Sequence, residues 1–155
     1  MARQVPYSDT TVSVNKTIAE IEELLQVHEV DAIMKNLEAS RVTSLSFKKD
    51  NIPFQLPVKT EAVYQYLVNK RRNQWALTQD DKARIHAQAD RCAWRNLMAM
   101  VKAQLALVEL EMVTITEVFM PYILVANGET AYEAMMAGGM PALMTPGVDT
   151  ERIKG

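Results

Sequence analysis

The stretch that decides the fold is TQDDKARIHAQADRCAWRNLMAMVKAQLALVELEMV, residues 78–113. On one side of it, apolar residues recur at helical spacing: Ile85, Ala89, Leu97, Val101, Leu105, Val108 and Met112. On the other side, four cations follow one another at intervals of seven, four and seven residues: Arg84, Arg91, Arg95 and Lys102. The two patterns predict one long amphipathic helix with a core-facing stripe and a row of cations.

Composition limits the class of protein. The chain has 155 residues, 48% hydrophobic and 23% charged, which predicts one folded domain with a real core. Its net charge of −2 means that any contact with nucleic acid must use a local patch. The one cysteine excludes an intramolecular disulfide. No apolar run is long enough to span a bilayer, so we expect no membrane partner and a cytoplasmic location.

Common catalytic and cofactor motifs are missing from the sequence. None of the five glycines precedes Gly128, which excludes glycine-rich phosphate loops and dinucleotide fingerprints. His28, His86 and Cys92 lack a spacing that would converge on a metal ion. The carboxylates form no recognisable acid–base pair, and no serine sits in a nucleophile elbow. We therefore expect a non-enzymatic protein without cofactor or metal.

The segments before residue 41 predict alternating strand and helix. Residues 10–14 alternate as in a short strand. Thr17 and Glu20 match a capping box that would open a helix ending near residue 27. Residues 30–37 form a weaker strand candidate.

The clearest β-hairpin spans residues 41–58. Its turn is predicted at residues 48–51, because Asp and Asn tolerate the backbone conformations that a tight turn needs. Pro53 and Pro57 cannot donate to a ladder, so the second strand is expected at an edge. A short helix is expected over residues 60–68.

Turn and cap signals organise the remainder. Thr78 is expected to cap the long helix, and a second capping box begins at Thr114 and limits a helix near Pro121. Asn127-Gly128 is a turn signal, and Thr130 opens a last short helix that ends at residues 138–139. The order β-α-β-β-β followed by helices predicts an α+β domain over residues 1–139, with a small mainly antiparallel sheet, and an irregular tail over 140–155.

Two basic features are the candidate sites. The first is the cation row on the long helix, whose arginines suit bidentate contact with phosphates. The second is KRRNQW, residues 70–75, in which cations would track a phosphate backbone while the indole stacks on a base. The candidate residues are Lys70, Arg71, Arg72, Trp75, Arg84, Arg91, Arg95 and Lys102. The alternatives are a solvated helix face, intersubunit pairs with Glu20, Glu22 and Glu23, and a charged loop anchored by Trp75.

Two further features concern packing and association. Trp94 is either a second stacking platform or part of a core or interface. Methionines gather near the C-terminus at positions 135, 136, 140 and 144, where they either dock subunits or pack on their own domain. A helix as long as residues 78–113 outruns the core of so small a domain, so we expect a homo-oligomer.

Parts of the chain resemble a family of small uncharacterised proteins of tailed bacteriophages and prophages. The resemblance lies in TVSVNKTIAEIEELL (11–25), WRNLMAMVKAQLALVE (94–109) and TEVFMPY (116–122), with the basic Trp-containing segment before the long helix. Family members carry a glycine after the first helix, where this chain has Glu29. The resemblance implies a phage accessory protein acting in the host cytoplasm and transfers no functional residue.

Three hypotheses about function follow. The first is a protein that binds nucleic acid, most plausibly single-stranded, through the basic helix face and the segment 70–75. The second is an oligomeric counter-defence protein that sequesters a signalling nucleotide or blocks a host protein. The third is an assembly protein without a ligand, whose long helix and Met-rich tail are interfaces.

Overall fold

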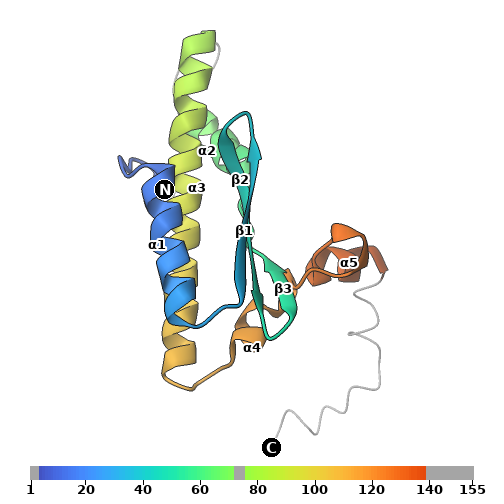
Figure 1. The fold of residues 1–155 in the computed structure, drawn as a ribbon. Helices are drawn as coiled ribbons and strands as arrows, with labels where there is room; N and C mark the ends of the chain where they lie inside the picture. Colours follow the sequence, from blue (N-terminus) through green and yellow to red (C-terminus); the bar gives the residue numbers. More distant parts are fainter. Residues whose placement is uncertain (1–3, 72–75, 139–155) are drawn as a thin grey trace, which may run out of the picture.

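The computed structural model describes residues 4–71 and 76–138, which form one small sheet and several helices (Figure 1). The order is α1 (Val14–Val27), β1 (Ala32–Glu38), β2 (Arg41–Lys49), β3 (Ile52–Gln55), α2 (Thr60–Lys70), α3 (Gln79–Glu109), α4 (Ile115–Phe119) and α5 (Ala131–Gly138). Two short 3₁₀ turns, Met120–Tyr122 and Ala126–Gly128, lie between α4 and α5. The predicted α+β class, with an antiparallel sheet followed by one long helix, is confirmed. The predicted tail 140–155 lies outside the described residues.

The predicted strand over residues 10–14 is wrong. Residues 4–13 form an irregular arm that crosses α3, and the side-chain amide of Gln88 donates to the carbonyls of Ser8 (3.1 Å) and Thr10 (2.9 Å). The carbonyls of this segment are thus bonded to a side chain instead of to the backbone of a neighbouring strand. Helix α1 starts at Val14 because Ser13 caps it by accepting from the Lys16 N–H at 3.2 Å. The capping box predicted at Thr17 is therefore wrong as well, and Thr17 is buried inside the helix.

The sheet is antiparallel in the order β1-β2-β3. Asp50 and Asn51, with φ of 51° and 65°, make the predicted tight turn between β2 and β3. β3 is the predicted edge strand and contains Pro53, while Pro57 lies beyond its end. Its outer side meets a later segment through a bridge between Phe54 and Ile123. The outer segment also donates from the Leu124 N–H to the Pro53 carbonyl at 2.8 Å.

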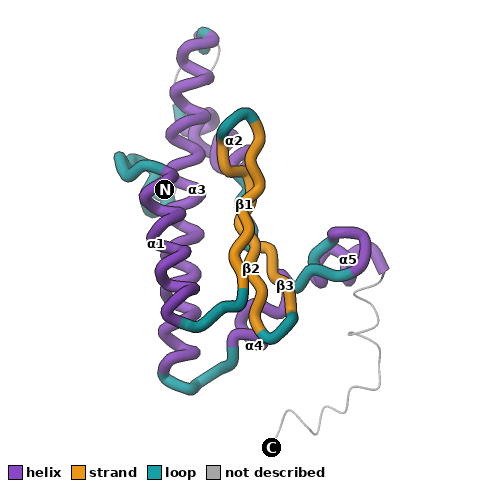
Figure 2. The backbone as a smooth tube through the Cα atoms, in the orientation of Figure 1, coloured by secondary structure: helices purple, strands orange, loops and turns teal. Residues whose placement is uncertain are grey.

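The core lies between one face of the sheet and the pair α1 and α3, which run side by side (Figure 2). The sheet contributes Leu45, Phe47, Phe54 and Leu56. The two helices contribute Ile18, Ile21, Leu25, Trp94, Leu97, Met98, Val101 and Leu105. Ile115 and Phe119 of α4 complete the core at the end nearest the C-terminus of α3. Four residues of the predicted apolar stripe, Ala89, Leu97, Val101 and Leu105, are buried, and Val108 packs against the core. Ile85 and Met112 lie outside the core, and Trp94 and Met98, which the predicted stripe did not include, lie in it.

Helix α3 has 31 residues, so it is about 46 Å long at 1.5 Å per residue. Thr78 and Asp81 form the capping box that starts it. The prediction that it continues to residue 113 is wrong by four residues. Leu110 is its C-cap, Glu111 turns the chain with φ of 59°, and Met112 is 66% exposed instead of facing the core.

The C-terminal predictions are largely confirmed. Thr114 and Glu117 form a reciprocal capping box on α4. Asn127 and Gly128 both have positive φ, at 76° and 74°, as the turn requires. Thr130 opens the last helix as predicted and accepts from the Glu133 N–H at 3.3 Å, but its hydroxyl donates to the Glu133 carboxylate, so only half of a capping box forms. In the described ranges, no helix combines the length and the apolar content needed to cross a membrane.

Candidate nucleic-acid interface

Helices α2 and α3 form an antiparallel pair whose tip carries cations. Thr60, at the start of α2, donates to Asp90 of α3 at 2.8 Å. Further along, the Tyr64 ring lies 5.8 Å from that of His86. The pairing brings the end of α2 to the first turns of α3, which extend past the start of α1 (Figure 1). We call this end of the α2–α3 helical hairpin the hairpin tip.

Three predicted arginines line one open cavity at the hairpin tip. Arg71 comes from the end of α2, and Arg84 and Arg91 come from α3. The cavity has a volume of about 420 Å³, and its other lining residues are Asp81, Ile85 and Gln88. We call it the arginine cleft. Guanidinium groups from two helices around an open hollow are suited to a phosphate, which accepts several N–H bonds at once.

Asp81 offsets part of this positive charge. The backbone N–H of Thr78 donates to its carboxylate at 3.1 Å. That bond and the Thr78 hydroxyl hold the pKa of Asp81 below its ordinary value, and Arg71 and Arg84 act in the same direction. Asp81 therefore stays ionised, and three arginines and one carboxylate leave the cleft with a charge of +2. The Arg84 side chain is 79% exposed and only loosely paired, with its Nη2 3.8 Å from the Asp81 oxygen.

Arg91 is held in position by a residue that the sequence did not single out. Gln88 accepts from the Arg91 guanidinium, at 3.1 Å from Nε and also from Nη2, while its amide nitrogen binds the arm. The arm thus fixes Gln88, and Gln88 fixes Arg91. A glutamine on a helix gives no signal of this role in the sequence, because the role depends on a segment 80 residues away.

The two C-terminal residues of the predicted cation row, Arg95 and Lys102, have different environments. Arg95 donates to the carboxylate of Glu20 on α1, and its side chain is only 19% exposed. The pairing considered between subunits is thus made within the chain. Lys102 lines a separate pocket that also contains Glu20, Glu23 and Glu109. It lies about 27 Å along the helix axis from Arg84, at 1.5 Å per residue. The four cations therefore do not form one continuous track.

The remaining predicted residues divide into described and undescribed. The Lys70 ammonium lies 5.9 Å from the centre of the Tyr66 ring, at the last residue of α2. Arg72 and Trp75 lie outside the described residues. Trp94 is completely buried in the core, so it is not a stacking platform.

Charge is distributed unevenly along the chain. Residues 70–91 hold six of the 17 Lys and Arg residues but only three of the 19 Asp and Glu residues. This segment therefore has a net charge of +3, and the rest of the chain has −5. The segment that contains the hairpin tip is therefore locally basic within a chain of net charge −2, and a polyanion site on such a chain needs a local excess of cations.

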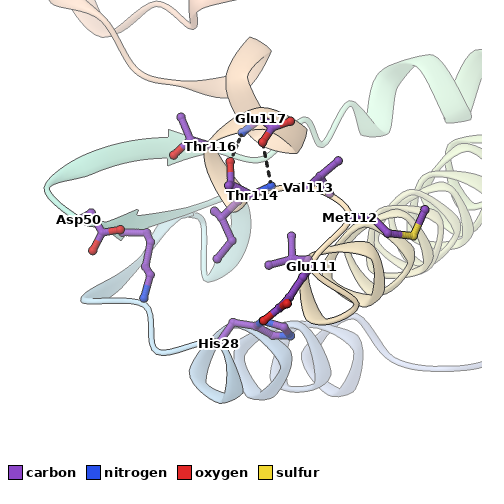
Figure 3. A pocket seen from close by; sticks show the side chains of 11 residues that line it. His28, Asp50, Glu111, Met112, Val113, Thr114, Thr116 and Glu117 are labelled. Atoms are coloured by element: carbon purple, nitrogen blue, oxygen red, sulfur yellow. Dashed lines mark hydrogen bonds between the residues drawn. The ribbon is translucent and has the colours of Figure 1, made fainter.

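A second pocket, of about 480 Å³, lies at the opposite end of α3 (Figure 3). Its lining includes Asp50, Glu117 and His28, and Glu111 lies beside His28. The Glu117 carboxylate is already engaged, because it accepts from the Thr114 N–H at 3.2 Å. The parts of the chain that the structure describes contain no group of three His, Cys, Asp or Glu residues placed to hold a metal ion. The pocket offers neither a cation cluster nor an activated nucleophile.

Two other predicted features are also located. Cys92 is buried, and burial raises the pKa of its thiol above the ordinary value, which keeps the thiol protonated and unreactive. On α5, Tyr132, Met135 and Met136 are 52%, 43% and 51% exposed, and this helix has no buried residue. Met140 and Met144 fall outside the described ranges.

The chain matches no protein-family model, no curated protein and no solved structure.

Proposed function

We propose that the protein is a non-enzymatic binder of single-stranded nucleic acid and that the hairpin tip is its contact surface. Arg71, Arg84 and Arg91 contact phosphates in the arginine cleft. Arg72 and Trp75, in the connection between α2 and α3, add a further phosphate contact and a stacking surface worth about 1–3 kcal/mol per base.

The observation that carries the proposal is the convergence of three arginines from two helices on one cleft. Arg84 and Arg91 lie on one face of α3, two turns apart, but Arg71 reaches the same cleft only because α2 folds back along α3. The solvated-face alternative gives no reason for this gathering, since like charges repel one another when no anion is bound. Arg95 and Lys102 are left outside the contact surface, because one is paired with Glu20 and the other lies far from the cleft.

We further propose that this is a phage accessory protein acting in the cytoplasm of a bacterial host. The proposal rests on the resemblance of residues 11–25, 94–109 and 116–122 to proteins of tailed phages. Single-stranded nucleic acid is formed during replication and recombination of a phage genome, so a binder of this kind has a substrate there.

Arg84→Gln and Lys102→Gln form a matched pair that tests the proposal. Both remove one cation from the same row of α3, but only Arg84 lines the arginine cleft. Anisotropy of a labelled oligothymidylate of roughly 15 nucleotides, at about 50 mM salt, measures the dissociation constant. We expect Arg84→Gln to weaken binding about tenfold, since one charge-assisted contact is worth about 1.4 kcal/mol. We expect Lys102→Gln to leave the constant within about twofold.

Equal losses from both variants would contradict the cleft as the contact surface. A larger loss from Lys102→Gln would move the site to the pocket that Lys102 lines with Glu20, Glu23 and Glu109. Binding of a small cyclic nucleotide, without binding of the oligomer, would favour the counter-defence hypothesis.

A further inference from the structure

A second cavity adjoins Arg91, on the side of α3 that faces the sheet. It has a volume of about 370 Å³ and lies between the start of α1, the start of β2 and α3. Its polar lining consists of Thr11, Ser13, Arg41, His86, Asp90 and Arg91. We call it the Arg41 pocket. Arg91 is shared with the arginine cleft, so the two hollows are neighbours.

Arg41 is held in position by a buried carboxylate. Its Nε lies 3.2 Å from Oδ2 of Asp90, whose side chain is only 7% exposed. The other oxygen, Oδ1, accepts from the Thr60 hydroxyl at 2.8 Å. Both oxygens of Asp90 are thus engaged. The Arg41 side chain is 43% exposed, and within residues 4–71 and 76–138 its two terminal nitrogens make no hydrogen bond.

Arg91 faces the same hollow and is also held by a partner. Gln88 accepts from its Nε and Nη2, and the arm carbonyls of Ser8 and Thr10 fix Gln88 in turn. Each guanidinium is therefore oriented by a residue that is itself bonded to another element. Pre-oriented guanidinium groups lose little side-chain freedom when they bind an anion, which favours a specific contact.

We propose that the Arg41 pocket binds a phosphate group, with Arg41 and Arg91 as its two donors. The hydroxyls of Thr11 and Ser13 line the same space and supply neutral donors. Resting on the proposed function, the pocket is a second phosphate subsite beside the arginine cleft, and Arg91 joins the two. The chain of a single strand then passes over α3 between the arm and the hairpin tip.

The test follows the side-chain Nε–Hε signals of Arg41 and Arg91 by ¹H–¹⁵N NMR of the full chain. One probe is inorganic pyrophosphate, and the other is the oligothymidylate used above. We expect both probes to shift the Arg41 signal in a saturable way. Arg41→Lys keeps a cation beside Asp90 but replaces the guanidinium, which can donate two parallel N–H bonds to one phosphate, by an ammonium group. We therefore expect it to weaken pyrophosphate binding about tenfold.

The matched control is Lys48→Ala, which removes an exposed cation from the same strand, β2, and is expected to change binding by less than about twofold. Melting temperatures show whether both variants are folded, and the wild-type signals test the pocket independently of any variant.

The outcomes separate the two proposals. If the oligomer binds but neither probe moves the Arg41 signal, the subsite is wrong and the proposed function stands. If pyrophosphate moves the signal but the oligomer does not bind, the subsite stands as a site for a small phosphate compound and the proposed function fails. Equal weakening by Arg41→Lys and Lys48→Ala would also overturn the subsite.

Discussion

Replacing Trp94 by alanine is expected to lower the free energy of unfolding by about 3–5 kcal/mol. Trp94 is completely buried and packs within the core that joins α1, α3 and the sheet. Its removal leaves a cavity that a close-packed interior fills only in part. Because domains of this size are stable by only about 5–15 kcal/mol, the variant loses a large share of its stability. Urea unfolding followed by circular dichroism at 222 nm measures the loss without relying on tryptophan fluorescence.

Trp94→Phe is the matched control for this prediction. The indole Nε1 is buried, and no hydrogen-bond partner for it occurs among the residues that the structure describes. Phenylalanine keeps an aromatic ring and removes this unpaired donor, whose burial carries a penalty of about 1–3 kcal/mol. We therefore expect Trp94→Phe to cost less than half as much as Trp94→Ala. Equal costs would show that the donor has a partner and that the indole shape is required.

The second large effect is expected from Phe119→Ala, at about 3–5 kcal/mol. Phe119 is the fully buried last residue of α4. Its ring meets Phe47 of β2 edge-on, with centres 5.6 Å apart, and lies 6.3 Å from Phe54 of β3. These contacts attach the short helix α4 to the sheet, so the loss combines cavity formation with the loss of two aromatic pairs.

Met120→Ala is the control, because Met120 is the next residue and is 52% exposed. Its replacement is expected to change the free energy of unfolding by less than about 0.5 kcal/mol. A Phe119 variant as stable as the Met120 variant would contradict the packing of α4 on the sheet.

Local signals in the sequence predicted most of the fold. The Thr78 and Thr114 caps and the turns at Asp50-Asn51 and Asn127-Gly128 are each encoded within four residues, and each is confirmed. The helical period also located part of the buried face of α3, at Ala89, Leu97, Val101 and Leu105, but not Trp94 or Met98.

The errors arose where distant segments compete with local patterns. Val12 and Val14 alternate as in a strand, but the amide of Gln88, some 80 residues away, takes the carbonyls of this segment. Thr17 has the better capping-box spacing, but it is buried, and the simpler cap at Ser13 starts the helix. A motif of a few residues does not reveal which distant segment its backbone will contact.

The candidate site shows the same division. The spacing of the sequence predicts the cation row. Only the folded chain shows that Arg84 and Arg91 line the cleft, whereas Arg95 forms an ion pair with Glu20. Arg41 gave no signal at all, because its position beside Asp90 depends on three elements that meet in space.

The measurement that tests the central claim most directly is the salt dependence of wild-type binding to the oligothymidylate. Four arginine–phosphate contacts, at Arg71, Arg72, Arg84 and Arg91, predict that the logarithm of the association constant falls against the logarithm of salt with a slope of about −3, since each contact with a single strand contributes about −0.7. Binding is then about fiftyfold weaker at about 200 mM than at about 50 mM salt. No binding at the lower salt, or binding with a slope near zero, would contradict the account.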